Sequence, residues 1–427
     1  MTIPLESTGA LQRRLTLTLP AAEIEQQVAA RLTQLARQTR VNGFRPGKAP
    51  LSVIRRQHGA RVRDEVVGEL LQGKFIEGLS EHQLRPAGNP SINAETTDDA
   101  EALTFSASFE VFPEIELADL SGVTVTVPTA SVSDEDVEKM LDRMRRQRAE
   151  WPTVERAAAT DDRVVIDFAG SIDGEAFEGG SAQEVPIVLG SGTLIGDFEE
   201  QLLGASAGDT RTVNVTFPDD YPRENLAGKS AQFEVTVREV QEMQLPALDA
   251  ELAKAFGIED GDLDTLRSRL RERLEQELTG ALRRRRKAAV MQMLAEQHQF
   301  DVPHSLVHQE AHNLAHQAQQ RNPAVDPHGD MAPFEVEAER RVKLGLLLAE
   351  ITQREGIKAD PQRVRAEIER MATGFDDKDM VVNWYYSQPE RLQEIENMTL
   401  EEQLVDWVLS KVQVTEETLP FDDAVAA

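Results

Sequence analysis

Four histidines have the spacing that metal chemistry would require. In the stretch "PHSLVHQEAHNLAHQ" they recur at every fourth position, at His304, His308, His312 and His316. A helix would align their imidazoles along one face, where they could be ligands of Zn²⁺ or Ni²⁺. However, no acidic motif or catalytic site accompanies them, and neutral histidines are readily tolerated on a surface. We therefore expect neither a bound metal nor a cofactor.

The loop "VNGFRPGKAP", residues 41–50, carries residues suited to binding an anionic surface. Phe44, Arg45 and Lys48 combine one aromatic face with two cations. The residues that free or restrict its backbone are Gly43, Pro46, Gly47 and Pro50. The loop would therefore present its tip stiffly. The alternative is an ordinary helical hairpin whose phenylalanine packs into the core.

The distribution of charge favours a functional surface at this loop. The chain of 427 residues has a formal net charge of −29, and such an excess of acid ordinarily argues against nucleic-acid binding. However, residues 1–112 contain equal numbers of acidic and basic residues, and residues 26–63 contain Arg and Lys but no Asp or Glu. The basic character is thus local and surrounds the loop.

Composition excludes several classes of protein. The chain has no cysteine, which excludes disulfides and Cys-based metal sites and suits a reducing compartment. The start lacks the pattern of a signal peptide, and no stretch has about 18 consecutive apolar residues. We expect a cytoplasmic protein that does not associate with a membrane.

Residues 1–112 are predicted to form a compact α+β domain. Alternating leucines over 11–19 predict a half-exposed strand that ends at Pro20. Apolar residues at helical spacing predict one helix from Ala21 and a second helix after the loop, and residues 104–111 alternate again. The loop therefore lies between two helices.

The segment "GFRPGKAP" resembles the ribosome-attachment signature of the bacterial trigger factor family. It matches that signature at Gly43, Phe44, Arg45, Gly47, Lys48 and Pro50. The resemblance implies that the loop docks at the mouth of the ribosomal exit tunnel, against ribosomal RNA and a tunnel-rim protein. It also implies a chaperone that binds nascent and unfolded polypeptides without ATP, and a homodimer away from the ribosome.

Residues 151–245 read as short β-branched strands separated by Gly, Asp and Pro turns, with one short helix in "GDFEEQLLGA". The scattered aromatic side chains of this segment would by themselves indicate only a hydrophobic core. The segment is similar, however, to FKBP-type peptidyl-prolyl isomerase domains, chiefly through "VVIDFAGSIDGEAFEGG" and "VLGSGTLIGDFEEQLLGASAGDTRTV". The resemblance implies an antiparallel sheet around that helix.

The FKBP resemblance also implies a proline-binding pocket. Phe198 would form its floor and Glu178 would lie beside it, where the wider family commonly has Trp and Asp. The other pocket residues would be Phe168, Phe177, Ile195, Tyr221 and Phe233. The substitution at the acidic position leaves the role of Glu178 open.

Two further segments complete the organisation. Residues 113–150 look like a connector, either a rigid spacer or part of a core. Residues 246–427 are predicted to be mainly helical, as a closed bundle or as open arms that expose apolar surface; the resemblance favours arms. The run "RRRRK" at 283–287 is predicted to lie on a solvated helix surface.

The sequence therefore predicts a multidomain α+β protein: a ribosome-binding α+β domain (1–112), a connector (113–150), a small FKBP-like antiparallel β-sheet domain (151–245) and a helical chaperone domain (246–427). Its predicted function is that of a ribosome-associated chaperone that isomerises X-Pro bonds. One alternative is a free-standing isomerase with helical partner-binding domains and no ribosome role. An RNA-binding factor would explain residues 26–63 but not the isomerase-like segment.

Overall fold

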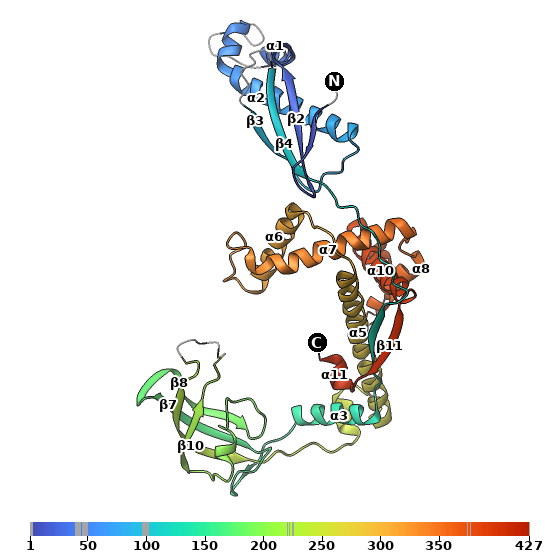
Figure 1. The fold of residues 1–427 in the computed structure, drawn as a ribbon. Coiled ribbons are helices and arrows are strands. Elements are labelled where there is room, and N and C mark those ends of the chain that lie inside the picture. Colours follow the sequence, from blue (N-terminus) through green and yellow to red (C-terminus); the bar gives the residue numbers. More distant parts are fainter. Residues whose placement is uncertain are drawn as a thin grey trace. The chain divides into compact units, whose positions relative to one another are not determined.

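The computed structural model describes residues 3–38, 44, 50–95, 102–219, 221, 223, 226–373, 375 and 377–426. The chain divides into two compact units (Figure 1). The first consists of Met1–Val127 and Arg285–Glu416, and the second of Pro128–Arg284 and Glu417–Ala427. Across the described ranges, no helix is both long enough and apolar enough to span a bilayer.

The first unit begins with an antiparallel sheet of strand order β1-β2-β4-β3 that packs against two helices. The alternation predicted for residues 11–19 is confirmed, because Leu15, Leu17 and Leu19 are fully buried while their neighbours face outward. The predicted end of this strand at Pro20 is also confirmed. The elements are β1 (Leu5–Ser7), β2 (Gln12–Pro20), α1 (Ala21–Gln38), α2 (Leu51–Glu81), β3 (Ser91–Glu95) and β4 (Ala102–Glu110).

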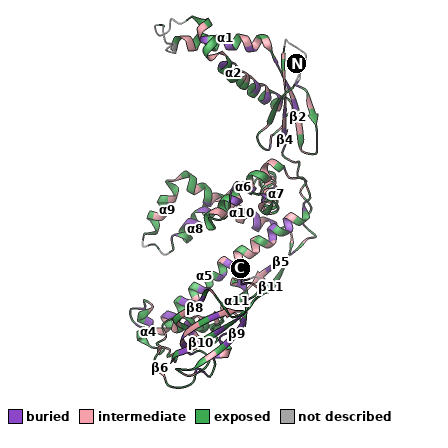
Figure 2. Cartoon of the chain, turned by 90° about the vertical axis from the view of Figure 1, so that its left-hand side faces the viewer, coloured by how far each residue is buried: buried purple, intermediate pink, exposed green. Residues whose placement is uncertain are grey.

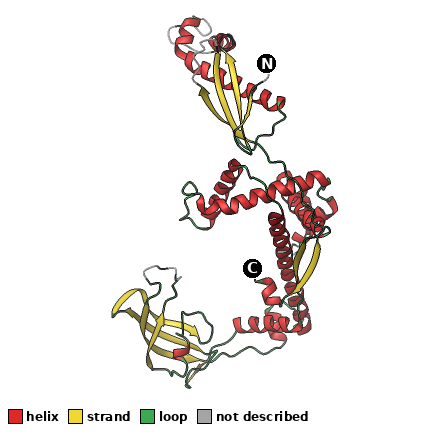
Figure 3. Ribbon diagram, viewed as in Figure 1, coloured by secondary structure: helices red, strands yellow, loops and turns green. Residues whose placement is uncertain are grey.

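The second unit contains a five-stranded antiparallel sheet of order β6-β10-β7-β8, with β9 also paired to β10. Its strands are yellow in the lower left part of Figure 3. The short helix predicted within "GDFEEQLLGA" is a single 3-10 turn, Glu200–Leu202. Gly196 and Gly204 both adopt positive φ, a left-handed conformation that bounds the turn on both sides. The strands are β6 (Thr153–Val154), β7 (Arg163–Ile172), β8 (Glu175–Val188), β9 (Thr210–Thr216) and β10 (Ser230–Gln241).

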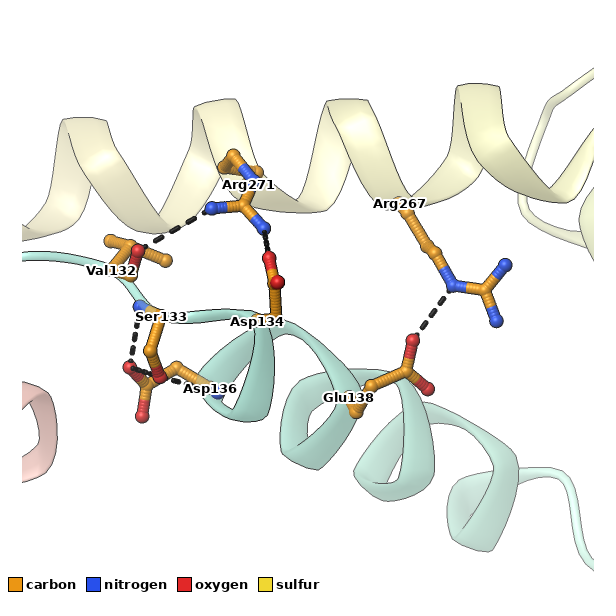
Figure 4. A network of polar contacts seen from close by, with 7 residues as sticks. All are labelled: Val132, Ser133, Asp134, Asp136, Glu138, Arg267 and Arg271. Atoms are coloured by element: carbon orange, nitrogen blue, oxygen red, sulfur yellow. Dashed lines mark hydrogen bonds and ion pairs between the residues drawn. The ribbon is translucent and has the colours of Figure 1, made fainter.

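The predicted connector is part of a core. Its helix α3 (Asp134–Gln147) buries Val137 and Leu141 against the first half of α5 (Leu263–Gln297). Ser133 caps α3: its hydroxyl accepts from Asp136 N (3.2 Å), and the Asp136 carboxylate accepts from Ser133 N (2.9 Å). Arg267 and Arg271 of α5 donate to Glu138 and Asp134 of α3 (Figure 4). The helices α4 (Ala250–Ala255) and α11 (Phe421–Val425) complete this core.

The remainder of the first unit is mainly helical, as predicted, and its described helices form three separate cores rather than one closed bundle. β5 (Thr124–Thr129) contributes to the largest core and pairs with a strand near the carboxyl end, β11 (Gln413–Thr418). The helices are the last turns of α5, then α6 (His304–Arg321), α7 (Ala332–Glu355), α8 (Pro361–Met371), α9 (Lys378–Tyr386) and α10 (Pro389–Leu409).

The helices carry buried, half-buried and exposed residues (Figure 2). Two expectations from the sequence are wrong for them. The apolar spacing in this part of the chain predicts a buried stripe of Val342, Leu346 and Ala349, but these residues are half-buried or exposed, and the buried face of α7 carries Leu347 and Ile351. The basic run at 283–287 is not simply solvated either: Lys287 contacts Glu401 (2.6 Å) and Arg286 contacts Asp406 (3.3 Å), both on α10.

Candidate active site

An open cleft of about 510 Å³ lies on the five-stranded sheet, and strands, a turn and a loop supply its walls. β7 carries Phe168, β8 carries Phe177 and Glu178, and β10 carries Phe233. The turn before the 3-10 helix adds Ile195 and Phe198, and the segment after β9 adds Tyr221. All seven residues assigned to a pocket from the sequence therefore line one cleft.

Phe233 is the centre of the aromatic packing in the cleft. It makes edge-on contacts with three rings, and the distances between ring centroids are 5.9 Å to Phe168, 6.1 Å to Phe177 and 5.5 Å to Phe198. Such edge-to-face pairs each contribute about 0.5–1.5 kcal/mol beyond the burial of their area. Phe198 and Phe233 are buried, whereas Phe168 and Phe177 are half-buried. The buried rings thus form a rigid base under an accessible wall.

This packing requires a glycine on β7. A Cβ atom built on Gly170 would lie 2.4 Å from Cε1 of Phe233 and 3.0 Å from the main-chain oxygen of Gly180. No real Cβ atom tolerates such distances, so any larger residue would displace the Phe233 ring. Gly170 therefore determines where the base of the cleft lies.

A second wall is held by the buried carboxylate of Glu199. This carboxylate accepts hydrogen bonds from the main-chain nitrogens of Gly190, Gly192, Thr193 and Leu194, at 2.8–3.1 Å, and from the Ser191 hydroxyl. Burial alone would raise the pKa of Glu199, but the hydrogen bonds from Leu194, Gly192, Ser191 and Thr193 outweigh it and hold that pKa below its usual value. Glu199 thereby fixes the loop that places Thr193, Leu194 and Ile195 in the cleft.

Sequence reasoning missed several residues of this site. Glu199 carried no signal of its role, because the loop it anchors becomes visible only in three dimensions. Phe217 is not among the residues that the family resemblance assigns to the pocket, although it contacts both Phe177 and Tyr221. The other lining residues that were not predicted are Gly179, Val185, Ile187, Thr193, Leu194, Arg223 and Leu226.

The chemistry available in the cleft is that of an apolar surface. Its polar side chains, among the described lining residues, are Glu178, Thr193, Tyr221 and Arg223. Glu178 is exposed, and Arg223 donates to its main-chain oxygen (3.1 Å) rather than to its carboxylate. The described lining thus offers no Cys, His or Ser as a nucleophile. It can hold an apolar group and exclude water from the polar bonds beside it.

The second candidate site, the loop at 41–50, lies mostly outside the described residues. Gly43, Arg45, Pro46, Gly47 and Lys48 are not described; Pro50 precedes the first residue of α2. The side chain of Phe44 is 42% exposed, which argues against the alternative that it packs into the core.

Several arginines of the basic stretch around the loop form ion pairs with acidic residues that lie outside this stretch in sequence. Arg55 and Arg63 on α2 both contact Glu25 on α1. Arg31 contacts Glu69 (3.1 Å), and Arg61 contacts Glu65 (2.8 Å). These acids flank the acid-free stretch in sequence, and the pairing of the two helices brings them beside it. The local excess of positive charge is therefore partly neutralised.

Comparisons with known proteins agree over the whole chain. Sequence profiles match for "Bacterial trigger factor protein (TF)" over residues 1–144, "FKBP-type peptidyl-prolyl cis-trans isomerase" over 154–238 and "Bacterial trigger factor protein (TF) C-terminus" over 262–410. A protein named trigger factor from Thioalkalivibrio sulfidiphilus is 44% identical over 99% of this chain and 98% of its own length. Trigger factors from Pseudomonas aeruginosa (44% identity, covering 100% and 98%) and Laribacter hongkongensis (42%, covering 99% and 99%) are similarly close.

Proposed function

The chain belongs to the bacterial trigger factor family, ribosome-associated chaperones with an FKBP-type peptidyl-prolyl isomerase domain, and we propose that it isomerises X-Pro bonds in the aromatic cleft on the five-stranded sheet. The observation that carries this proposal is the convergence of Phe168, Phe177, Phe198 and Phe233 on one accessible cleft. A proline ring is a small apolar group that such a surface can hold.

The cleft accelerates isomerisation by selecting the twisted amide. Rotation about the X-Pro bond is slow because twisting loses amide resonance, at a cost of about 18–20 kcal/mol. The twisted amide has less charge separation between its carbonyl oxygen and nitrogen than the planar amide has. Removal of water therefore penalises the planar ground state more than the transition state. This mechanism needs no nucleophile, metal or proton transfer.

The residues of the cleft have different parts in binding the X-Pro segment. Phe198 and Phe233 form the buried base on which the proline ring lies, and Phe168, Phe177 and Ile195 form the half-buried walls. Tyr221 packs on Phe217 at a centroid distance of 4.8 Å and borders the opening. Glu178 stands exposed at the rim, where it contacts the peptide that flanks the proline rather than the reacting bond.

The test compares three pocket variants in proline-limited refolding of a client protein. Ile195→Ala and Tyr221→Ala remove half-buried side chains, and we expect them to lower the rate of catalysed refolding while the fold persists. Phe198→Ala should lower it further, although a stability loss of up to about 3–5 kcal/mol accompanies the cavity. The matched control is Phe375→Ala, which removes an exposed ring outside the sheet. Unchanged catalysis in folded Ile195→Ala and Tyr221→Ala would refute the pocket.

We also propose that the loop at 41–50 docks on the ribosome through ribosomal RNA and a tunnel-rim protein. We propose further that the chain works in the cytoplasm on nascent polypeptides. Away from the ribosome, it forms a homodimer. The exposed ring of Phe44 supports the docking on ribosomal RNA, because an aromatic face can stack on an unpaired base.

Cosedimentation with vacant ribosomes tests the docking. The variant Phe44→Ala/Arg45→Ala/Lys48→Ala should bind more weakly at every salt concentration, and its binding should respond less steeply to salt. A control triple, Phe375→Ala/Arg365→Ala/Lys378→Ala, removes the same residue types elsewhere. Equal cosedimentation of the loop variant and the wild type at matched salt would exclude the loop as the anchor.

A further inference from the structure

Imidazoles are concentrated in one part of the chain. Five of its eight histidines lie between residues 304 and 328. Four of them follow one face of α6, and His328 lies in the segment that joins α6 to α7. The ring of His328 is 5.4 Å from that of His316 and 6.4 Å from that of His312, measured between centroids. The histidines of the helix and of the connecting segment thus form one continuous cluster.

Within this cluster, His308 and His312 have the geometry of a chelating pair. Their Nε2 atoms lie 3.2 Å apart. Two imidazole nitrogens bound to one tetrahedral ion, each at about 2.0–2.1 Å, are separated by about 3.3 Å. The helix has thus already brought both nitrogens to the required separation. Without a metal the contact is a hydrogen bond, so an ion takes the place of the proton between the two Nε2 atoms, and the His308 ring then carries its proton on Nδ1.

The other nitrogen of His312 is held as in many metal-binding histidines. Its Nδ1 lies 3.3 Å from the main-chain oxygen of Pro327, and a carbonyl can only accept, so Nδ1 carries the proton. The neutral ring then has its lone pair on Nε2, which faces His308. A ligating imidazole commonly donates its second N–H to a carbonyl in this way, which fixes the tautomer and the ring orientation. This contact was invisible in the sequence, where the spacing alone did not favour a metal.

We propose that His308 and His312 bind a divalent first-row transition ion, Cu²⁺, Ni²⁺ or Zn²⁺, through their two Nε2 atoms. Solvent completes the coordination sphere, since no group of three or more acidic or histidine side chains among the described residues is arranged to hold an ion. Imidazole ligands favour these ions over Mg²⁺, and the Irving–Williams order places Cu²⁺ as the tightest. Two protein ligands make an open, exchangeable site.

Binding has a structural consequence for the α6–α7 hairpin. The core between these helices is small: its buried members are Ala311, Ala315, Met331 and Ala338. An ion on His312 strengthens the polarised Nδ1–H contact with Pro327 and so ties α6 to the connecting segment. Because the folded helix holds both nitrogens at the chelating separation, the ion binds the folded hairpin more tightly than the unfolded chain, and the stabilisation grows with the logarithm of its concentration.

The test titrates the full chain, without a purification tag, with Cu²⁺, Ni²⁺, Zn²⁺ and Mg²⁺ in a non-chelating buffer. Calorimetry should show one Cu²⁺ ion per chain bound most tightly and no heat with Mg²⁺. His308→Gln and His312→Gln should each weaken binding by at least about tenfold, because loss of even an outer partner of a ligand costs 10–100-fold. The matched control is His58→Gln on α2, which should bind as the wild type does.

Hydrogen exchange supplies a second readout. Saturating Zn²⁺ should slow the exchange of amides in residues 304–338 in the wild type and in His58→Gln, and should leave His312→Gln unchanged. Wild-type affinity in both His308→Gln and His312→Gln would overturn the proposal, as would the absence of binding by all three transition ions. Binding without any slowing of exchange in the hairpin would overturn the structural consequence.

Discussion

At the scale of single residues, the geometry of the proposed active cleft depends on groups that do not line it. Gly170 and Glu199 both act by positioning: the first leaves room for the ring of Phe233, and the second holds the loop that carries Leu194 and Ile195. Neither belongs to the aromatic set that a sequence pattern singles out. Substitutions at these two positions change where the walls of the cleft lie without changing which side chains line it.

Gly170→Ala should impair isomerisation although it removes no side chain of the cleft. The new methyl group would overlap the Phe233 ring, and such overpacking typically costs about 1–3 kcal/mol. We expect slower catalysed refolding together with faster hydrogen exchange in β10. Gly68→Ala on α2 is the control, because its Cβ would meet nothing within 4 Å. A fully active Gly170→Ala variant would contradict the role of Phe233 as the base.

Glu199→Gln should destabilise the isomerase domain at neutral pH but not in acid. Because the pKa of Glu199 is lowered in the folded state, its contribution is fully present above the unfolded value of about 4.5 and is lost as the pH falls through the folded value. Hydrogen bonds to a charged group contribute about 1.5–3 kcal/mol. Calorimetry should therefore show a gap in melting temperature between the variant and the wild type at pH 7 that narrows below about pH 4.5. A gap of constant size would contradict this.

At the scale of elements, the sequence predicted those whose apolar period was regular. The strand that carries Leu15, Leu17 and Leu19 was predicted correctly, because one of its faces is buried along its length. The face of α7 was misplaced because leucines follow one another at 346–348, and only packing decides which of them is buried.

Ser133→Ala should loosen α3 locally. The Ser133 hydroxyl and the Asp136 carboxylate accept hydrogen bonds from two main-chain nitrogens at the start of this helix. Loss of such a cap typically costs about 1 kcal/mol. Hydrogen exchange should accelerate in the first turn of α3, while β7 and β10 remain unchanged. Ser268→Ala, on an exposed position of α5, is the control and should leave exchange in α3 as in the wild type. Equal exchange in both variants would show that packing alone holds the helix.

At the scale of the whole molecule, contacts between distant parts of the chain could not be read from the sequence. Pairing of β5 with β11 joins residues almost 300 positions apart, as in the Thr126–Thr415 contact (3.1 Å), and no local pattern specifies such a partner. For the same reason, residues 113–150 looked like a connector although they supply a strand and a helix to two cores. The pocket residues were found through family resemblance, since composition alone indicated only a core.

The isomerase domain should be removable without unfolding the rest. Its ends meet in an antiparallel bridge, where Glu150 N donates to Gln244 O (3.0 Å) and Gln244 N donates to Glu150 O (2.9 Å). Such a doubly bonded pair is the closing pair of a two-residue hairpin, and Asn-Gly is the sequence that this turn favours. Replacement of residues 151–243 by Asn-Gly should therefore preserve the bridge and the packing of α3 on α5.

The deletion variant separates the two activities of the chaperone. Catalysis of proline-limited refolding should be lost, whereas cosedimentation with ribosomes and suppression of client aggregation should persist, because covering apolar surface requires no isomerisation. Hydrogen exchange in α3 and α5 should match that of the wild type, which verifies that the remainder is folded. A folded deletion variant that no longer suppresses aggregation would place the main client surface on the isomerase domain, since the aromatic cleft would then be the surface that holds unfolded chains.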